Sequence, residues 1–178
     1  MYHEVLDFWF DELTDEQKWM KDTRIDREIE KRFGRLHTKA AKGELFEWRE
    51  EHLGRLAEII ILDQFSRNIY RGDARSFASD DMALVLAQEA ILQKADEGFT
   101  TRKKHFLYMP YMHSESLTIQ KEGLRLFEKL DNDMALQYMH QHMGIIERFG
   151  RYPHRNEVLG RESTPEEIDF LKMPNSSF

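Results

Sequence analysis

Four arginines lie close together near the carboxyl end of the chain, in the stretch from Ile145 to Ile168. The stretch from Arg148 to Arg161 contains only one acidic residue, Glu157, so its charge is +3 with histidine neutral. The whole chain carries a net charge of −7. A guanidinium group matches the two oxygens of a carboxylate or a phosphate. The stretch therefore predicts an anion site. Alternatively, the arginines pair with nearby acids and hold a long loop in place.

A second set of polar residues lies at the end of an apolar helical stripe. Apolar residues between Leu53 and Ile60 recur at helical spacing, and the same face continues to Gln64 and Asn68. Asp63 and Arg67 lie beside this face, in the acid-before-base order that stabilises a helix. If these groups are buried they must form hydrogen bonds, because each unpaired group costs about 1–3 kcal/mol.

Histidine interrupts two further apolar faces. His113 and Gln120 share a face with leucines, with Glu115 close by, and His142 lies on the face that ends at Phe149. A lone histidine in such a place is usually a core residue bonded to a backbone carbonyl. Three helices that each direct polar groups inward near one end, however, indicate a shared pocket.

We therefore expect the segments around Asp63–Asn68, His113–Gln120 and Arg148–Asn156 to form one pocket for a small anion, a carboxylate-bearing ligand or a peptide. Because helix ends meet loops, Asp63 and Arg67 should pair with residues of the loop that follows Phe149. The predicted ligand-binding residues are Asp63, Gln64, Arg67, Asn68, His113, Glu115, Gln120, Arg148, Arg151, His154, Arg155 and Asn156.

Three functions fit these residues. A small-molecule enzyme, hydrolase-like, would use His113 or His154 as general base or acid, oriented by Asp63 or Glu115. A structural or interaction scaffold would only pair its arginines internally. A closed pocket with a histidine beside a carboxylate would favour the enzyme, and an open groove would favour a peptide-binding protein. The binding protein would clamp its ligand with Arg67, Arg148, Arg151 and Arg155, and orient it with Asn68 and Asn156.

The sequence lacks the usual signatures of metal and cofactor sites. His140 and His142 are two residues apart and point to opposite sides of a helix, and no HExxH pattern occurs. Glycine-rich phosphate loops and a GxSxG turn are absent as well. Cysteine is absent, which excludes disulfides and thiolate catalysis. We expect neither a metal nor a cofactor.

Amphipathic patterns of helical period must position these residues. Apolar residues from Ile25 to Ala40 step by three and four, and the run Ile59–Leu62 has helical spacing on both sides, which favours helix over a buried strand. No strand pattern with hairpin turns occurs. The chain predicts an all-α fold of about eight helices, joined mostly by short connections that make neighbours antiparallel.

Particular residues predict where helices begin and end. Pro110 should end the helix that contains Phe106, because proline cannot continue a helix without loss of a hydrogen bond. Gly150 should close the last long helix, which begins at Asp131 or Asn132. A short final helix should begin in the sequence Thr164-Pro165-Glu166-Glu167, where Thr164 and Glu167 form a capping box.

Length and composition favour one soluble domain that spans residues 1–178. Hydrophobic residues make up 40% and charged residues 33% of the chain, a globular balance. The amino-terminal residues lack a signal peptide, and no run approaches the roughly 18–20 apolar residues of a membrane span. We expect a cytoplasmic protein that binds no membrane. The net charge of −7 also argues against nucleic-acid binding.

Three long motifs resemble a known family. LDQFSRNIYRG (Leu62–Gly72), FLYMPYMHSE (Phe106–Glu115), RFGRYPHRNEVLGRESTPEE (Arg148–Glu167) and the opening LDFWF are similar to the bacterial domain of unknown function family 924. The resemblance implies a bacterial protein with a tetratricopeptide-like α–α superhelix, and it implies no established activity. The family often has proline after DQF, where this chain has Ser66; Asp63 and Arg67 remain in place.

Overall fold

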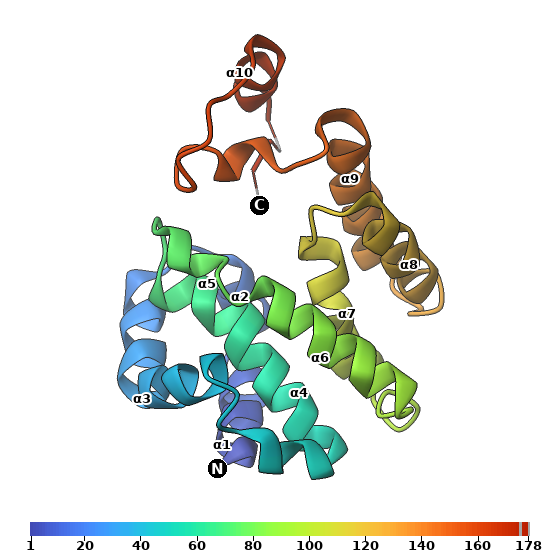
Figure 1. Cartoon of the computed structure of the whole chain (residues 1–178). Helices are drawn as coiled ribbons and strands as arrows, with labels where there is room; N and C mark the ends of the chain where they lie inside the picture. The colour runs from blue at the N-terminus through green and yellow to red at the C-terminus, as the bar shows by residue number, and fades with distance from the viewer. Residues whose placement is uncertain (175, 178) are drawn as a thin grey trace.

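Every regular element is helical in the computed structural model, which describes residues 1–174, 176 and 177 (Figure 1). The predicted all-α fold is confirmed, and the tetratricopeptide-like superhelix stays a prediction. No helix within those residues is long and apolar enough to span a membrane. The α-helices are α1 (Tyr2–Asp7), α2 (Asp15–Trp19), α3 (Thr23–Ala41), α4 (His52–Ile60), α5 (Ser66–Ile69), α6 (Asp80–Leu92), α7 (Thr101–His113), α8 (Leu117–Phe127), α9 (Asp133–Phe149) and α10 (Pro165–Leu171). Short π-turns span Phe8–Glu12 and Ile61–Phe65, and 3-10 turns span Phe46–Glu50, Ala74–Ser76 and Pro153–Arg155.

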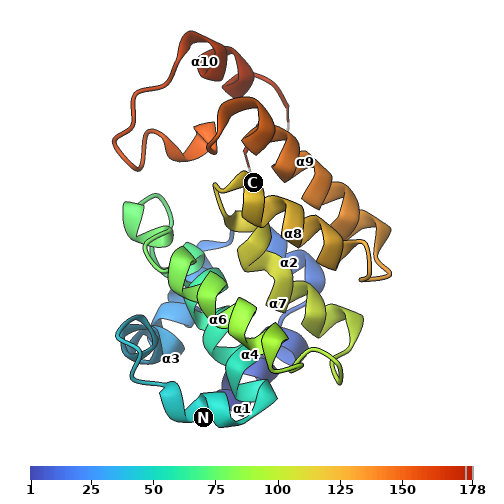
Figure 2. The ribbon, with the colours of Figure 1, turned by 45° about the vertical axis from the view of Figure 1, so that its right-hand side comes forward.

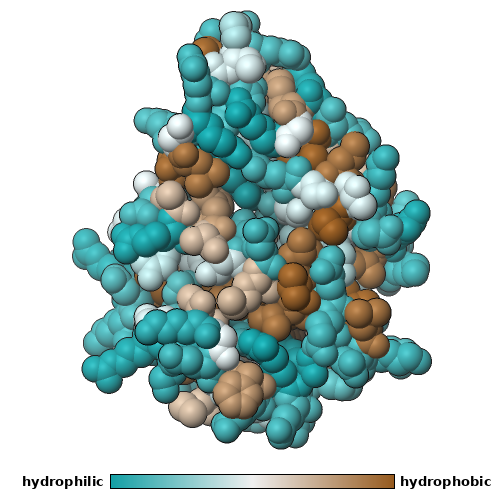
Figure 3. Space-filling model, in the orientation of Figure 1, coloured by the Kyte–Doolittle hydropathy of each residue, from teal (hydrophilic) through white to brown (hydrophobic). Residues whose placement is uncertain are grey.

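Helices that are neighbours in sequence are mostly neighbours in space. Helix α6 packs between α4 and α7, and α8 packs between α7 and α9, whereas α3 lies against α5 at the outer edge (Figures 1 and 2). Figure 3 shows this outer edge as hydrophilic, with hydrophobic side chains in the middle of the face that α6 crosses. The carboxyl-terminal loop and α10 lie beyond the end of α9 (Figure 1).

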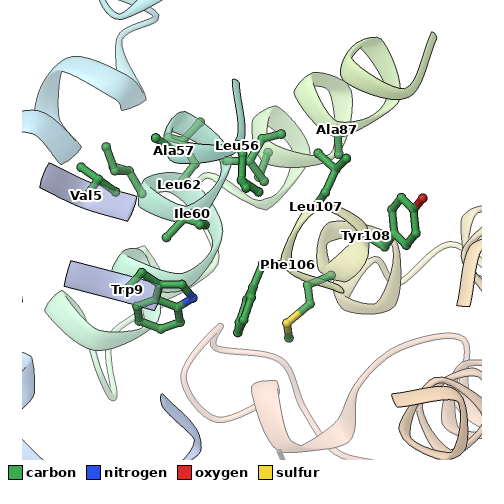
Figure 4. Close-up of a cluster of buried hydrophobic side chains, with 14 of the residues drawn as sticks. Val5, Trp9, Leu56, Ala57, Ile60, Leu62, Ala87, Phe106, Leu107 and Tyr108 are labelled. Carbon is green, nitrogen blue, oxygen red and sulfur yellow. The ribbon is translucent and has the colours of Figure 1, made fainter. Parts of the chain in front are cut away.

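One large apolar core holds α1, α4, α6 and α7 together. Trp9 lies edge-on to Phe106, with ring centroids 5.4 Å apart (Figure 4). It also lies edge-on to Phe65, with ring centroids 5.7 Å apart. These aromatic rings are almost fully buried, and burial of each large side chain stabilises the fold by about 1.5–3 kcal/mol. A smaller cluster of Ile145 and Tyr152 joins the end of α9 to the carboxyl-terminal loop.

The segment that contains Asp63 runs through the middle of the molecule. Helix α4, the π-turn Ile61–Phe65 and α5 follow one another without a break, and every residue from Leu56 to Ser66 is buried. A helix buried on all sides has no polar face. The predicted stripe of α4 therefore passes into a segment that is covered on all sides, and the polar residues of the π-turn must find partners inside the protein.

Pro110 does not end its helix. Helix α7 continues through Pro110 to His113, so His113 and Gln120 belong to different helices and share no helical face. Proline removes one helical hydrogen bond, at a typical cost of about 3 kcal/mol. All residues from Phe106 to His113 are buried, and this burial offsets the cost.

The other predicted helix boundaries are observed. Gly150 closes α9 in the left-handed conformation, with φ of 69°. The Asn132 side chain accepts a hydrogen bond from the amide of Ala135 at the start of the same helix. Thr164 and Glu167 form both bonds of the capping box. These boundaries direct the chain from α9 back toward the end of α7.

Gly123 allows α8 to approach α7 closely. A β-carbon at Gly123 would lie 2.9 Å from Cβ of Tyr111, whereas one at Gly144 in α9 would meet nothing within 4 Å. We expect Gly123→Ala to lower the free energy of unfolding by about 1–3 kcal/mol through overpacking. Gly144→Ala should raise it by about 0.5–1 kcal/mol, because alanine favours the helix. Urea unfolding of both variants checks this, and equal effects would contradict the close approach.

Candidate functional site

Asp63 is a buried carboxylate at the centre of the site. Its side chain is only 1% exposed, and its Oδ1 lies 2.6 Å from Nδ1 of His113 and 3.5 Å from the guanidinium of Arg67. The Gln64 amide donates to its other oxygen. The π-turn places Asp63 so that it faces the end of α7 rather than solvent. Without these partners, burial of the charge would cost several kcal/mol.

Arg67 connects Asp63 to helix α6. Its guanidinium donates to both carboxylate oxygens of Asp80, at 2.8 and 2.9 Å, and to the backbone carbonyl of Asp63 at 2.7 Å. Asp80 is the first residue of α6. This paired geometry satisfies the charge of Arg67 within the chain.

Arg155 comes from the loop after α9 and has a less complete set of partners. Its guanidinium lies between the rings of Phe77 and Tyr152, 4.5 and 4.6 Å from their centroids. One terminal nitrogen donates to the carbonyl of His113 at 3.0 Å, and the other lies 3.3 Å from Asp80, which Arg67 already binds. The Nε–H group is buried without a partner. Burial, together with the charge of Arg67, lowers the pKa of Arg155.

Glu115 fixes the far side of the same loop. It accepts two hydrogen bonds from Arg161, at 2.7 and 2.9 Å, and one from the backbone amide of Tyr152 at 2.7 Å. Arg161 also donates to the side chain of Asn156 at 3.0 Å. Glu115 thereby holds the loop against the connection between α7 and α8.

Gln120 joins three segments from inside. Its amide nitrogen donates to the carbonyls of Met112 and Ser114, both at 2.7 Å, and lies 2.8 Å from the hydroxyl of Tyr152. The Tyr152 hydroxyl in turn donates to the carbonyl of Met112. These bonds fix the end of α7, the start of α8 and the loop relative to one another.

A cavity of about 390 Å³ lies against these groups. His113 and Arg155 border it, so the inner end of the Asp63 network is one wall of the cavity. No group of three or more histidines and carboxylates that could hold a metal ion is present in the part of the chain that the structure describes. The residues around the cavity are Ala74, Phe77, Ala78, Asp80, Asp81, His113, Ser114, Glu115, Arg155 and Leu159.

The buried charges determine how His113 carries its protons. Burial alone would raise the pKa of Asp63, but the positive charges and hydrogen bonds around it lower that pKa to about 2. Burial lowers the pKa of His113, and the charge of Arg67 lowers it further. When His113 is uncharged, the tautomer with its proton on Nδ1 donates that proton to ionised Asp63. Its Nε2 then carries a lone pair on the side of the ring away from Asp63.

The structure brings together residues from all three predicted segments. Asp63, His113 and Arg155 belong to one network, and Glu115 lies at its edge. The predicted pairing of Asp63 and Arg67 with the loop after Phe149 is indirect, because Asp80 and His113 lie between them and Arg155. The segments meet as expected, but through a helix that the prediction left out.

Other predicted residues lie away from the cavity. Asn68 donates to Asp26 of α3 at 2.9 Å. Arg148 binds Glu166, and Arg151 binds Glu167 of α10. His154 packs beside Tyr152, with ring centroids 5.5 Å apart, and burial lowers its pKa to about 4. The remaining two, Gln64 and Asn156, bind Asp63 and Ser163 respectively.

The prediction missed several residues of the site, among them two acids and two aromatic residues. Asp80 and Asp81 look in sequence like ordinary acids in the first turn of a helix, which favour the helix dipole. Phe77 and Tyr152 look like core aromatics, and only the structure places both against Arg155. The available signal was the excess of arginine, which requires carboxylates somewhere else in the chain.

Comparisons with known proteins agree with this fold. A family model described as "Bacterial protein of unknown function (DUF924)" matches residues 5–175. The chain is similar to a solved protein of unknown function from Agrobacterium tumefaciens, ATU0120, with 36% identity over 96% of each chain and a TM-score of 0.92. No curated protein matches the chain.

The ionised carboxylate of Asp63 should contribute measurably to the free energy of unfolding, and this contribution should depend on pH. Its folded pKa is lowered, so its contribution is complete above the unfolded value of about 4 and disappears as the pH falls toward 2. Asp63→Asn should destabilise the protein near pH 6 by roughly 3–5 kcal/mol, because Arg67 loses a buried partner. The difference from the unmodified chain should shrink below about pH 4. Urea unfolding from pH 2.5 to 6 measures it, and a difference that grows with acid would contradict the assignment.

Proposed function

We propose that this chain, which belongs to the DUF924 family of bacterial proteins of unknown function, binds a small molecule through one carboxylate or similar anionic group beside Arg155. The ligand occupies the cavity between α6, the end of α7 and the carboxyl-terminal loop. Cavities of about 300–1,000 Å³ are typical of small-molecule sites, and this one has a volume of about 390 Å³.

The incomplete partnering of Arg155 carries the proposal. Asp80 gives both oxygens to Arg67, and its contact with Arg155 is longer, at 3.3 Å. Arg155 is nevertheless 92% buried as a side chain, so water does little to stabilise its charge. An anionic group in the cavity would supply the missing counter-charge.

The other arginines of the predicted clamp support a scaffold role instead. Arg67 binds Asp80, Arg148 binds Glu166 and Arg151 binds Glu167. These pairs hold helices and the loop together and leave those guanidinium groups occupied. The proposal therefore requires a ligand with a single anionic group and not a polyanion.

A second candidate function is proton transfer by His113. Its Nδ1 is 2.6 Å from Asp63, and the ring borders the cavity. This pair is one of the four pairs of histidine and carboxylate considered from the sequence, and it has both hydrogen-bond geometry and access to the cavity. Ionised Asp63 would keep His113 in the tautomer whose Nε2 accepts a proton, the arrangement of a general base. A bound molecule with an acidic hydrogen near Nε2 would be the substrate.

Removal of the Arg155 guanidinium should abolish anion binding and leave the fold intact. Simple carboxylates such as acetate, butyrate and benzoate at ten times their Kd should stabilise the unmodified chain by roughly 1.4 kcal/mol. This corresponds to about 3–5 °C in Tm for a chain of this size. Arg155→Ala should lose this shift, at a stability cost of about 1–3 kcal/mol for the lost bond to His113.

Arg148→Ala is the matched control for this experiment. It also removes an arginine of the same stretch, but one that pairs with Glu166 and lies away from the cavity. It should keep the carboxylate shift. If Arg155→Ala keeps the shift, or if no carboxylate shifts the unmodified chain, the proposal is wrong.

The second candidate predicts a reactive Nε2 on His113. Diethyl pyrocarbonate attacks neutral imidazole, so its rate of reaction at His113 should rise with pH. Because the pKa of His113 is lowered, the rate should become constant at a pH below about 6.5, the ordinary pKa of histidine. Asp63→Asn should slow the reaction severalfold, because asparagine no longer fixes the tautomer. Peptide mapping by mass spectrometry separates His113 from the other histidines, and buried His142 is an internal reference. A rate at His113 as slow as that at His142 would remove the base role.

A further inference from the structure

We infer that the ligand of this cavity is a zwitterion, with its carboxylate beside Arg155 and a protonated amine beside Asp81. The inference rests on the proposed function and names the class of ligand, a small amino carboxylate. It follows from a count of the charges at the cavity wall and of the partners each one has.

Two of the three carboxylates that border the cavity are already neutralised. Asp80 binds both nitrogens of Arg67, and Glu115 binds both nitrogens of Arg161. Within residues 1–174, 176 and 177, Asp81 forms no ion pair. The wall therefore has one unpaired anion, Asp81, and one incompletely paired cation, Arg155.

Asp81 and Arg155 differ in position as well as in sign. Arg155 is buried between two aromatic rings, whereas Asp81 is exposed in the first turn of α6 and still borders the cavity. A ligand that enters from solvent would meet Asp81 at the outer end and Arg155 at the inner end. Its anionic group would lie deep, and its cationic group would stay near the opening.

The remaining charges disfavour the alternatives. A phosphate or dicarboxylate would bring two negative charges to a wall whose one incompletely paired cation is Arg155 and whose one unpaired anion is Asp81, and the second negative charge would have no counter-ion there. A simple amine would leave Arg155 with only the carboxylate of Asp80, which it shares with Arg67. A zwitterion adds no net charge and provides a partner for each unpaired group.

The apolar residues of the cavity favour a ligand whose middle part is apolar. Phe77 and Leu159 border the cavity together with two alanines. A short aliphatic or aromatic part between the amine and the carboxylate would cover them. Amino carboxylates with an apolar body fit this wall better than ones with additional charges.

Matched ligands test the inference directly. Calorimetric Kd values are measured for ω-amino carboxylates of increasing length, from glycine to 6-aminohexanoate, and for the carboxylate and the amine of each length alone. With the unmodified chain, at least one zwitterion should bind about two- to fivefold more tightly than its own carboxylate, as a partly exposed ion pair contributes little more. Asp81→Asn should remove that preference and keep the binding of the carboxylate.

Asp133→Asn is the matched control. Asp133 is also an acid in the first turn of a long helix, α9, so both variants lose the same favourable charge at a helix start. Asp133 does not border the cavity, and its variant should keep the full preference for the zwitterion. Thermal unfolding of both variants confirms that they fold alike.

The outcomes separate the two levels of the proposal. If carboxylates bind through Arg155 but no zwitterion binds more tightly, the zwitterion inference is wrong and the proposed function stands. If neither carboxylates nor zwitterions bind, both are wrong. If the preference for a zwitterion survives Asp81→Asn, the amine lies elsewhere and the inference is overturned.

Discussion

A carboxylate buried in the middle of a protein must be neutralised where it lies, and Asp63 imposes this requirement on the whole carboxyl-terminal half of the chain. It lies in a helical segment that is covered on all sides, so water cannot solvate it. His113, at the end of α7, and Arg67, one helical turn after Asp63, compensate the charge of this carboxylate. The path of the chain after α6 is constrained by the need to bring these groups to one point.

Each buried charge that compensates another one needs a counter-ion of its own. Arg67 needs Asp80, Asp80 is shared with Arg155, and Arg155 also binds the carbonyl of His113. Acid and base alternate along this path from the central helix through α6 to the loop after α9. The path ends at a cavity, where its last member, Arg155, lacks a full set of partners. The same set of ion pairs therefore stabilises the fold at Asp63 and borders the cavity at Arg155.

Local patterns predicted most of the helices, because their period and their caps depend on nearby residues. Asn132, Gly150 and the capping box at Thr164 are examples. Pro110 was misjudged because its cost is offset by burial, which depends on distant helices. Three segments with polar residues among apolar ones were expected to meet, and the structure joins residues of all three in one network, although His113 and Gln120 share no helical face. The ion pairs of that network could not be predicted, because Asp80 became a partner of two arginines only through the packing of α6 beside α7.

The π-turn at Ile61–Phe65 restricts how this sequence can change during evolution. Such a turn holds one residue more than an α-helical turn, and loss of that residue would rotate everything after it by about 100°. Arg67 would then leave Asp80, and Ser66 would leave His37, with which it shares a hydrogen bond at 2.7 Å. In alignments of related chains, gaps should therefore fall in the loops near Gly43 and Gly98. The length between Leu53 and Asn68 should be constant, even where the identities of exposed residues have drifted.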